Sequence, residues 1–320
     1  MSNLKNVLPP RIFEVVERAG ISTFKQIMIL SVWDIKKLTN LRTDDIKFLK
    51  NVAADYICPI SHTCDKLLIE NELRVKTGCV EIDELLMGGF RRGTLTEIYG
   101  ESGSGKTLMA IQAAAHNSAA GCVFICTEDL FPVKRFAQMK HRFPNVSSKH
   151  DYGKNVYIEH ITEAQNLLSC VRVSLPKLLE KNKPALIVID SVAAPFRSEY
   201  SNYVQRAEDL RELAISLITL AQKYTLAVVC INQVTASFDG ADNVLPTLGL
   251  AWSNMVSTRL WLKKTNQSVH ISHLPMENRE KFRNTEQSVV VRKLSVIFSP
   301  DLPNSSLKFI ITSTGIQTVN

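Results

Sequence analysis

A glycine-rich segment that ends in lysine and threonine has the clearest chemical meaning in this chain. Its residues are Gly100, Glu101, Ser102, Gly103, Ser104, Gly105, Lys106 and Thr107. They fit the pattern G-x-x-x-x-G-K-[ST] of phosphate-binding loops, between a strand-like and a helix-like run. The glycines let backbone N–H groups face a phosphate, and the helix directs its positive end at the same anion. We expect Lys106 to contact the β- and γ-phosphates and Thr107 to bind Mg²⁺. The alternative is an ordinary glycine–serine turn before a helix.

A second candidate for holding Mg²⁺ is Asp190, which follows the apolar run 185–189. An all-apolar run of this length is typical of a strand buried on both faces of a parallel sheet. Ligands of open α/β sheets bind at the carboxyl ends of such strands. Asp190 is therefore expected to hold Mg²⁺ through water, beside Thr107. Taken alone, Asp190 could instead cap the helix that follows.

Two further strand ends carry polar side chains that suit nucleotide chemistry. Glu128 follows the strand-like run 122–127, where a carboxylate can orient a water that attacks the γ-phosphate. An acidic residue at the start of the next helix is the alternative. Gln233 follows the run 226–231, where an amide can sense the γ-phosphate and move the loop beyond it. That loop, 235–248, is expected to be mobile or ordered only by a ligand.

The order of patterns along the chain predicts an α/β protein in three parts. Residues 1–57 are predicted to form a small helical domain, 58–76 a linker, and 77–320 the α/β core. Strand-like and helix-like runs alternate after the phosphate-binding loop, which predicts a mostly parallel sheet with helices on both faces. The polar stretch 263–288 is expected to form an exposed hairpin or loop.

The N-terminal domain is predicted to contain a helix–turn–helix hairpin. Gly20 can end one helix in the left-handed conformation, and Ser22 can cap the next. Ser31 and Asp34 are expected to form a capping box for a third helix. Such hairpins can present backbone N–H groups to a DNA phosphate, and basic residues lie nearby. A plain packing or protein-contact module explains the same sequence equally well, so both interpretations stay open.

Composition and charge narrow the class of protein. The composition is that of a soluble globular protein, and the net charge of +7 favours a polyanionic partner. No run reaches the ~20 apolar residues of a membrane span, and the N-terminus lacks the apolar region of a secretory signal. Cys122 and Cys126 share one face of a predicted strand, which indicates core packing rather than a metal site. We expect a reduced, intracellular protein.

These motifs together resemble those of the RecA-like recombinase family over nearly the whole chain. The matching segments are 77–97, 127–128, 131–135, 189–191 and 232–234. The N-terminal helical unit is similar to the helix-hairpin-helix-type domain of the eukaryotic and archaeal branch. Within this branch, the run Ile189–Arg197 is typical of the recombinase paralogues. The resemblance implies a RecA-like P-loop ATPase core behind a small all-α N-terminal domain.

The resemblance also implies roles for single residues around ATP. Glu128 would activate the attacking water, and Gln233 would sense the γ-phosphate. Lys106 would take part in catalysis as well as in binding. Arg135 would stack its guanidinium on adenine, and Pro303 would lie in the cap over the nucleotide of a neighbouring subunit.

Two loops would line single-stranded DNA, and both depart from the pattern of a strand-exchange enzyme. The stretches 195–205 and 235–248 look short, and the second contains no lysine or arginine. Phosphate contacts supply much of nonspecific DNA affinity, so the second loop is poorly equipped for it. Arg197 and Arg206 keep some positive charge around the first loop.

The linker carries a second departure. Family members use an aromatic–x–x–Ala hook there to add a strand to a neighbour's sheet. Here the hook has Ile60 and Thr63 at the two anchor positions. Ile60 can still fill a pocket, but the change indicates a different partner.

The resemblance therefore implies an ATP- and Mg²⁺-binding recombinase paralogue with at most weak, DNA-dependent ATPase activity. It would form a heterodimer or larger complex with another paralogue, bind single-stranded or branched DNA, and assist the recombinase filament in homologous-recombination repair. The nucleus is the expected location, with the cytoplasm second. The alternative is a self-assembling, ATP-dependent strand-exchange recombinase, which Lys106, Glu128 and Gln233 favour and the second loop opposes.

Overall fold

The chain forms two compact units, residues 1–71 and 72–320, and each has hydrophobic clusters of its own. The computed structural model describes residues 4–58, 73–139, 142–143, 153–198, 202–236, 244–273 and 288–319.

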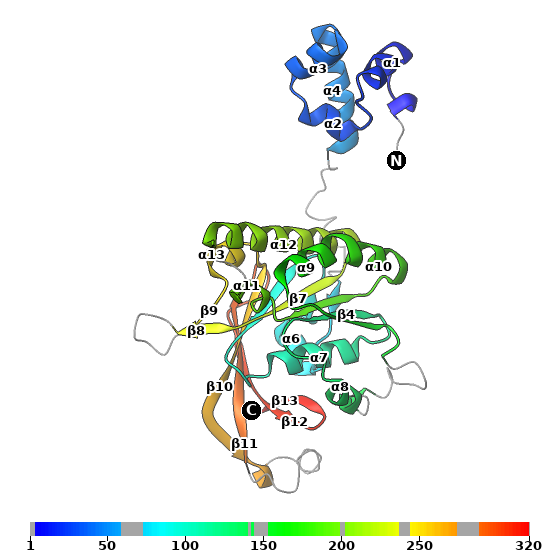
Figure 1. The fold of residues 1–320 in the computed structure, drawn as a ribbon. Helices are drawn as coiled ribbons and strands as arrows, with labels where there is room; N and C mark the ends of the chain where they lie inside the picture. Colours follow the sequence, from blue (N-terminus) through cyan, green and yellow to red (C-terminus); the bar gives the residue numbers. More distant parts are fainter. Residues whose placement is uncertain are drawn as a thin grey trace. The chain divides into compact units, whose positions relative to one another are not determined.

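The N-terminal unit is a bundle of short helices (Figure 1). They are η1 (Leu4–Asn6), α1 (Pro10–Arg18), α2 (Phe24–Ile29), α3 (Val32–Thr39) and α4 (Thr43–Ile57). Val16, Ile27, Ile35 and Leu49 are fully buried at its centre. Each helix thus contributes one apolar face to a shared core.

Side-chain caps determine where two of these helices begin. Thr23, and not the expected Ser22, caps α2, because its hydroxyl accepts a hydrogen bond from the backbone N–H of Gln26 at 3.2 Å. The Gln26 side chain accepts one from the Thr23 N–H in return. The capping box of Ser31 and Asp34 at α3 is present as expected.

The N-terminal unit has two turns in the left-handed conformation, the expected one after α1 and another between α3 and α4. Gly20 follows α1 with φ +75°, as expected. Asn40, with φ 52°, ends α3, and α4 begins shortly after it at Thr43. The first turn of α4 carries Asp44 and Asp45. Two carboxylates therefore already face the positive end of α4.

The core unit is built on a nine-stranded sheet. Its strands, from one edge to the other, are β13 (Gly315–Val319), β12 (Ser306–Thr312), β11 (Ser288–Phe298), β10 (Thr258–His270), β3 (Leu95–Tyr99), β7 (Ala227–Asn232), β6 (Leu186–Asp190), β4 (Cys122–Cys126) and β5 (Val156–His160). The pairs from β10 to β5 are parallel. Those from β10 to β13 are antiparallel. The predicted mostly parallel sheet is confirmed, with an antiparallel extension.

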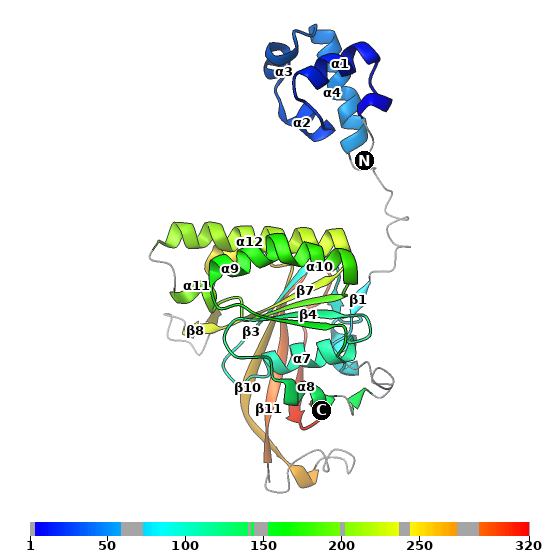
Figure 2. The ribbon, with the colours of Figure 1, turned by 45° about the vertical axis from the view of Figure 1, so that its right-hand side comes forward.

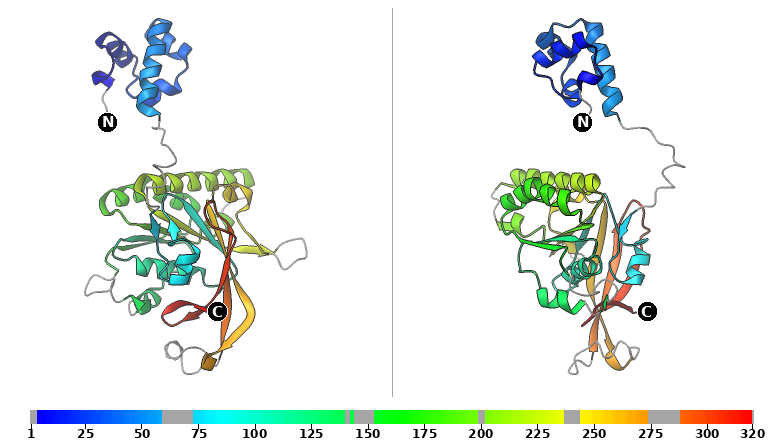
Figure 3. Two further views of the ribbon diagram at one scale, coloured as in Figure 1. Left: turned by 180° about the vertical axis from the view of Figure 1, so that it is seen from behind. Right: turned by 90° about the vertical axis from the view of Figure 1, so that its right-hand side faces the viewer.

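Helices cover both faces of the parallel part (Figures 1 and 3). One layer contains α6 (Val80–Leu85), α7 (Lys106–His116) and α8 (Val133–Met139). The other contains α9 (Ala164–Ser169), η3 (Cys170–Ser174), α10 (Leu175–Asn182), α12 (Tyr203–Tyr224) and α13 (Gly249–Ser253). On β6, Val188 packs on the first layer, and Ile187 and Ile189 pack on the second. This two-sided burial explains the uninterrupted apolar run before Asp190.

The stretch 263–288 was expected to form an exposed hairpin or loop, and its described part belongs to a hairpin. This hairpin of β10 and β11 extends beyond the helical layers (Figure 2), and residues 263–270 lie on its first strand. After η4 (Ile271–His273), the rest of the stretch lies outside the described residues. The side chains of 263–270 are exposed or only half-buried, so no apolar period marks this end of the hairpin in the sequence.

Short elements also occupy stretches that were expected to be irregular. They are β1 (Arg74–Val75) paired with β2 (Phe90–Arg91), α11 (Pro195–Ser198), and β8 (Val234–Ala236) paired with β9 (Val244–Pro246). The strand β1 lies within the stretch 58–76 and joins the core. Elements of two to four residues are set by tertiary pairing, because they are too short to show a hydrophobic period.

Candidate nucleotide-binding site

The glycine-rich loop connects the end of β3 to the start of α7. Gly100, Gly103 and Gly105 all have positive φ angles. A Cβ atom on Gly100 would lie 1.9 Å from the carbonyl oxygen of Leu262 on β10. Only glycine fits this close approach of two backbones. The loop therefore turns tightly enough to aim its N–H groups and the first turn of α7 at one point.

Lys106 folds its ammonium group back over the loop. Its Nζ donates hydrogen bonds to the carbonyl oxygens of Gly100 at 2.7 Å and Glu101 at 2.9 Å. Burial lowers the pKa of Lys106, and the charges of Asp190, Glu101 and Glu128 oppose that shift. The cation is thus held at the loop by contacts that a phosphate could replace.

Asp190 ends β6, and its carboxylate lies next to Thr107 at the start of α7. Burial raises the pKa of Asp190, although a hydrogen bond from the Thr107 hydroxyl and the charge of Lys106 act in the opposite direction. The next helix, α11, begins only at Pro195, so Asp190 does not cap it. A hydroxyl and a carboxylate are therefore paired where a hard cation would be coordinated.

This donor pair fits Mg²⁺ better than a metal held by protein alone. In the described residues, no group of three or more His, Cys, Asp or Glu side chains could hold a metal ion. Mg²⁺ keeps several waters and usually takes one or two carboxylates together with substrate phosphates. Thr107 and Asp190 thus suit Mg²⁺ that arrives with a nucleotide.

Two buried hydroxyl groups beside the loop support the same fit. Ser104 Oγ and Ser191 Oγ have no hydrogen-bond partner among the described residues, and both residues are buried. Ser104 belongs to the loop, and Ser191 follows Asp190 and lines the cavity described next. Unpaired buried polar groups are rare and call for an explanation such as an ion or water. A phosphate oxygen or a metal-bound water in that cavity would pair with Ser191.

Glu128 and Gln233 meet beside the loop from the ends of β4 and β7. Gln233 Nε2 donates a hydrogen bond of 2.6 Å to Glu128 Oε1. The backbone N–H of Gln233 donates to Asn232 Oδ1 at 2.8 Å. This bond restrains the backbone from which the Gln233 side chain extends. The helix α8 begins at Val133, so Glu128 does not belong to its first turn. The carboxylate and the amide are thus a directly bonded pair.

A cavity of about 730 Å³ brings these residues together. Its wall contains the glycine-rich loop together with Glu128, Asp190, Gln233 and Arg135. The chain segments that form it are far apart in sequence and meet at the carboxyl ends of parallel strands. A cavity of this size accommodates a ligand as large as a nucleotide.

Arg135, on α8, lies at the edge of this cavity. Its guanidinium donates to the carbonyl oxygens of Ser313 at 2.6 Å and Thr312 at 2.5 Å, and to Gln138 Oε1 at 2.9 Å. Burial lowers the pKa of Arg135. The turn between β12 and β13 therefore fixes the guanidinium plane, and a fixed plane can stack through its face.

Two cations at the loop were missed by the sequence analysis. Arg292 on β11 lines the cavity, and its Nε donates to the carbonyl oxygen of Gly103 at 3.2 Å. Lys264 on β10 extends its ammonium group to 3.1 Å from where a Cβ of Gly103 would lie, and its backbone N–H donates to Glu101 Oε1 at 2.9 Å. The sequence predicts only a hairpin or loop for 263–288, so the register of Lys264 against the glycine-rich loop could not be derived.

A buried carboxylate, Glu97 on β3, was also missed. It accepts hydrogen bonds from Asn232 Nδ2 at 2.7 Å, Trp252 Nε1 at 2.9 Å and Arg259 Nε at 2.5 Å. Asn232 in turn accepts one from the Thr247 hydroxyl at 2.8 Å. Glu97 therefore ties the end of β7, α13 and β10 to one point behind Gln233.

The predicted DNA-loop arginines lie on helices. Arg197 is exposed on α11, and Arg206 lies in the first part of α12. Residues 199–201, between the two helices, and 237–243, within the second loop, lie outside the described residues. The structure thus places both arginines at the borders of the first loop.

The predicted interface residues are only partly described. Ile60 and Thr63 lie outside the described residues. Pro303 is exposed in the connection between β11 and β12, and its carbonyl oxygen accepts a hydrogen bond from Ser305 Oγ at 3.2 Å. Pro303 is therefore accessible to another molecule.

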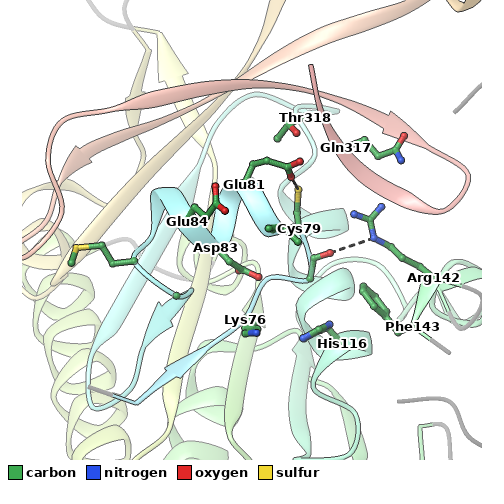
Figure 4. A pocket seen from close by; sticks show the side chains of 14 residues that line it. Lys76, Cys79, Glu81, Asp83, Glu84, His116, Arg142, Phe143, Gln317 and Thr318 are labelled. Carbon is green, nitrogen blue, oxygen red and sulfur yellow. Dashed lines mark hydrogen bonds between the residues drawn. The ribbon is translucent and has the colours of Figure 1, made fainter. Parts of the chain in front are cut away.

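A second cavity of about 800 Å³ lies at the other end of α7, around Cys79 and His116 (Figure 4). Arg142 Nε donates to the Gly78 carbonyl at 3.3 Å, and the Cys79 thiol donates to Glu81 at 3.3 Å. Burial raises the pKa of Cys79 to about 11, so the thiol is protonated at neutral pH. Glu81 and Arg142 line this cavity with opposite charges, so the cavity favours neither an anionic nor a cationic ligand.

Cys122 and Cys126 pack in the core as expected. No helix in the described parts of the chain is long and apolar enough to cross a membrane.

Comparisons with known proteins agree with this architecture. A family model described as Rad51 matches residues 69–319. The chain is 32% identical to the DNA repair protein XRCC3 of Bos taurus, over 97% of this chain and 96% of that protein. It is 32% identical to the XRCC3 homolog of Arabidopsis thaliana, over 77% and 93%. The crystal structure of the RadB recombinase superposes with a TM-score of 0.60 at 25% identity, over 77% of this chain and all of that one.

These matches confirm the resemblance to recombinase paralogues and the RecA-like fold of the core. The runs 125–129 and 230–235 had also indicated the X-ray repair cross-complementing protein of group three, the name that the two relatives carry. The chain belongs to the Rad51 family.

Proposed function

We propose that this chain binds ATP with Mg²⁺ and works as one subunit of a complex with another recombinase paralogue in homologous-recombination DNA repair. The observation that carries the proposal is the 730 Å³ cavity in which the glycine-rich loop, Asp190, Glu128 and Gln233 converge. Relatives named as DNA repair proteins support the role in repair.

In this proposal the side chains exchange their present partners for the nucleotide. Lys106 would leave the two loop carbonyls and contact the β- and γ-phosphates. Thr107 and Asp190 would hold Mg²⁺, which neutralises phosphate charge when bound. Arg135 would stack on adenine through its guanidinium face. Arg292 adds a cation from β11 on the same side of the loop.

Hydrolysis by the free chain is expected to be weak. Glu128 would have to orient a water, but Gln233 holds its Oε1 at 2.6 Å. The amide would release the carboxylate only when the γ-phosphate offers it another acceptor. The binding of ATP in the cavity would then matter more to this chain than the hydrolysis of ATP.

The open edge of the sheet supports an association with another subunit. β5 is the last strand of the described sheet, and Ile158 on it is exposed. A cavity of about 370 Å³ beside it is lined by Ile161, Cys170 and Val173 together with the polar residues Glu159, Asn166, Ser169 and Ser174. An exposed edge next to a partly apolar cavity suits the strand-plus-anchor mode of recognition. The hook around Ile60 would occupy the same place on a neighbour.

Binding of single-stranded or branched DNA is proposed as a task that is shared with the partner. The loop 235–248 has no lysine or arginine, and Arg197 and Arg206 supply the charge near the first loop. Affinity for nonspecific DNA depends on the number of phosphates neutralised, so this chain alone should bind weakly. We propose that the complex assists the recombinase filament in the nucleus.

A second candidate function is a recombinase that assembles its own filament and exchanges strands. The presence of Lys106, Glu128 and Gln233 on one cavity favours it, because these are the residues that ATP hydrolysis would use. The uncharged second loop opposes it.

Mass in solution tests the proposal. Light scattering would be recorded with ATP and Mg²⁺, for the chain alone and with purified paralogue subunits. A defined complex of one copy each, formed only with a paralogue, is the expected result. Long self-assembled filaments of this chain alone would overturn the proposal and favour the second candidate.

A further inference from the structure

The N-terminal unit exposes an apolar surface on two consecutive helices. We define the α2–α3 patch as Met28, Ile29, Val32 and Trp33. Ile29 is 73% exposed and Trp33 is 68% exposed. Met28 and Val32 are exposed as well. Large apolar side chains gathered on so small a unit mark an interaction surface.

Helical spacing gives this patch a basic border. Lys36 follows Val32 by four positions and Lys37 follows Trp33 by four, so each lysine is a neighbour on the same face of α3. The ammonium group of Lys37 lies 5.2 Å from the centre of the Trp33 ring. Ile35, which is turned by about 160° from Trp33 around α3, is fully buried. The exposed face of α3 is therefore apolar at its start and cationic one turn later.

A lysine on α4 and the capping box of α3 hold the α2–α3 patch in shape. Lys50 on α4 donates hydrogen bonds to the carbonyl oxygens of Leu30 at 2.6 Å and Met28 at 3.5 Å. The capping box of Ser31 and Asp34 fixes the start of α3. Both devices act on the link between α2 and α3. A preformed surface loses less entropy when it binds.

We propose that the α2–α3 patch binds an acidic, amphipathic helical segment of a partner protein. Leucine- or phenylalanine-like anchors would cover Ile29 and Trp33, because buried aromatic contacts dominate interface energies. Carboxylates that flank the anchors would face Lys36 and Lys37. This site lies in a different unit from the nucleotide cavity and the β5 edge, so it adds a partner to the proposed function.

The same observations disfavour DNA as the occupant. Met28, Ile29 and Val32 offer no ring on which a base can stack, so Trp33 is the one side chain of the patch that could do so. Asp34 lies in the first turn of α3, and Asp44 and Asp45 lie in the first turn of α4. These carboxylates occupy the helix N-termini on which a DNA phosphate would otherwise dock, whereas the proposed segment contacts the side chains of Lys36 and Lys37 instead.

The test measures binding of a defined peptide to the full-length chain. The probe is a fluorescein-labelled helical peptide with leucine at i, i+3, i+4 and i+7 and glutamate elsewhere. Fluorescence anisotropy should show saturable binding, and Trp33→Ala should weaken it by about tenfold or more. Lys36→Glu with Lys37→Glu should weaken it as well and should permit binding of a peptide in which lysine replaces glutamate.

Leu38→Ser is the matched control. Leu38 is 54% exposed on the same helix, but its position is turned by about 100° from Lys37 and away from Trp33. It should bind the peptide as the wild type does. The exposure of Trp33 makes loss of folding unexpected, and circular dichroism would verify this. No saturable binding, equal effects of Trp33→Ala and Leu38→Ser, or displacement of the peptide by polythymidine would each overturn the proposal.

Discussion

Gln233 Nε2 donates a 2.6 Å hydrogen bond to Glu128 Oε1 across the ends of two strands. The pair joins the residue proposed to orient water to the residue proposed to sense the γ-phosphate. Each can serve the nucleotide only after releasing the other. The geometry therefore links release of the carboxylate to occupancy of the cavity.

Gln233→Ala should separate nucleotide binding from its consequences. We expect ATP affinity to change by less than about tenfold, because the loss of one hydrogen bond costs about 1 kcal/mol. ATP-dependent partner binding should fall by about tenfold or more, because the sensing contact is gone. Hydrolysis should not fall in parallel, because the amide no longer holds Glu128. Titration with a fluorescent ATP analogue, a phosphate-release assay and a pull-down would measure the three quantities. Wild-type discrimination between ATP and ADP in the pull-down would contradict the sensor role.

Lys106→Ala should fold but lose ATP-dependent complex formation. Lys106 bonds two loop carbonyls and no other described group, and its buried charge is costly without a phosphate. The variant should melt no lower than the wild type in the absence of nucleotide, and ATP with Mg²⁺ should no longer raise its melting temperature. Partner binding that still depends on ATP in this variant would sink the proposal.

Arg292→Ala tests whether Arg292, which belongs to none of the sequence motifs, contacts a phosphate of ATP. Arg292 reaches the glycine-rich loop through its bond to the Gly103 carbonyl. A charge-assisted contact to phosphate is worth about 1.5–3 kcal/mol, so ATP affinity should fall by at least tenfold. Lys293→Ala is the matched control, because neighbouring side chains on β11 point to opposite faces of the sheet. Equal losses in the two variants, measured by calorimetry, would indicate a general charge effect instead.

The parts of this site that could be predicted lie next to unambiguous local signals. Lys106 and Thr107 follow a fixed glycine spacing, and Asp190 ends an apolar run whose burial on both faces the sheet explains. Parallel strands place such ends at one edge, so the meeting of Glu128 with Asp190 followed from topology. These inferences needed only the order of strands and helices.

The parts that could not be predicted depend on register between distant segments. Arg292 reaches Gly103 only because β11 pairs with β10, which in turn lies beside β3. In the sequence, Glu97 is a single polar residue within a predicted strand. The three side chains that donate hydrogen bonds to it lie on β7, α13 and β10. The hydrophobic periodicity of a strand cannot predict such contacts. A shift of the strand pairing by one residue leaves that periodicity unchanged, but it moves every side chain to the other face of the sheet.

Asp190→Asn should make the nucleotide-free chain more stable at neutral pH. Burial raises the folded-state pKa of Asp190 above the ordinary value of 3.8, so the folded state binds this proton more readily than the unfolded state. Stability of the wild type therefore falls as pH rises from that ordinary value through the raised one, and stays lower at pH 7. The Asp190→Asn variant should show no such decrease in stability as the pH rises.

Thermal melting of both proteins between acidic and neutral pH would measure the difference. The variant should also lose the stabilisation that ATP with Mg²⁺ gives the wild type, because an amide is a weaker ligand for a hard cation. A variant that melts below the wild type at pH 7, or retains the Mg²⁺-dependent stabilisation, would contradict this account of Asp190.

Glu97→Gln should destabilise the core more than any change in the cavity. Glu97 is fully buried and is the ion-pair partner of Arg259 at 2.5 Å. Removing one member of a buried pair costs about 3–5 kcal/mol, because the other charge is left uncompensated. The melting temperature should fall by roughly 2–4 °C for each kcal/mol in a unit of this size. Arg259→Met added to Glu97→Gln should recover part of the loss, since no unpaired charge is then buried. A double variant less stable than the single one would show that Arg259 contributes mainly through its other contacts, the ring of Phe298 and the hydroxyl of Ser253.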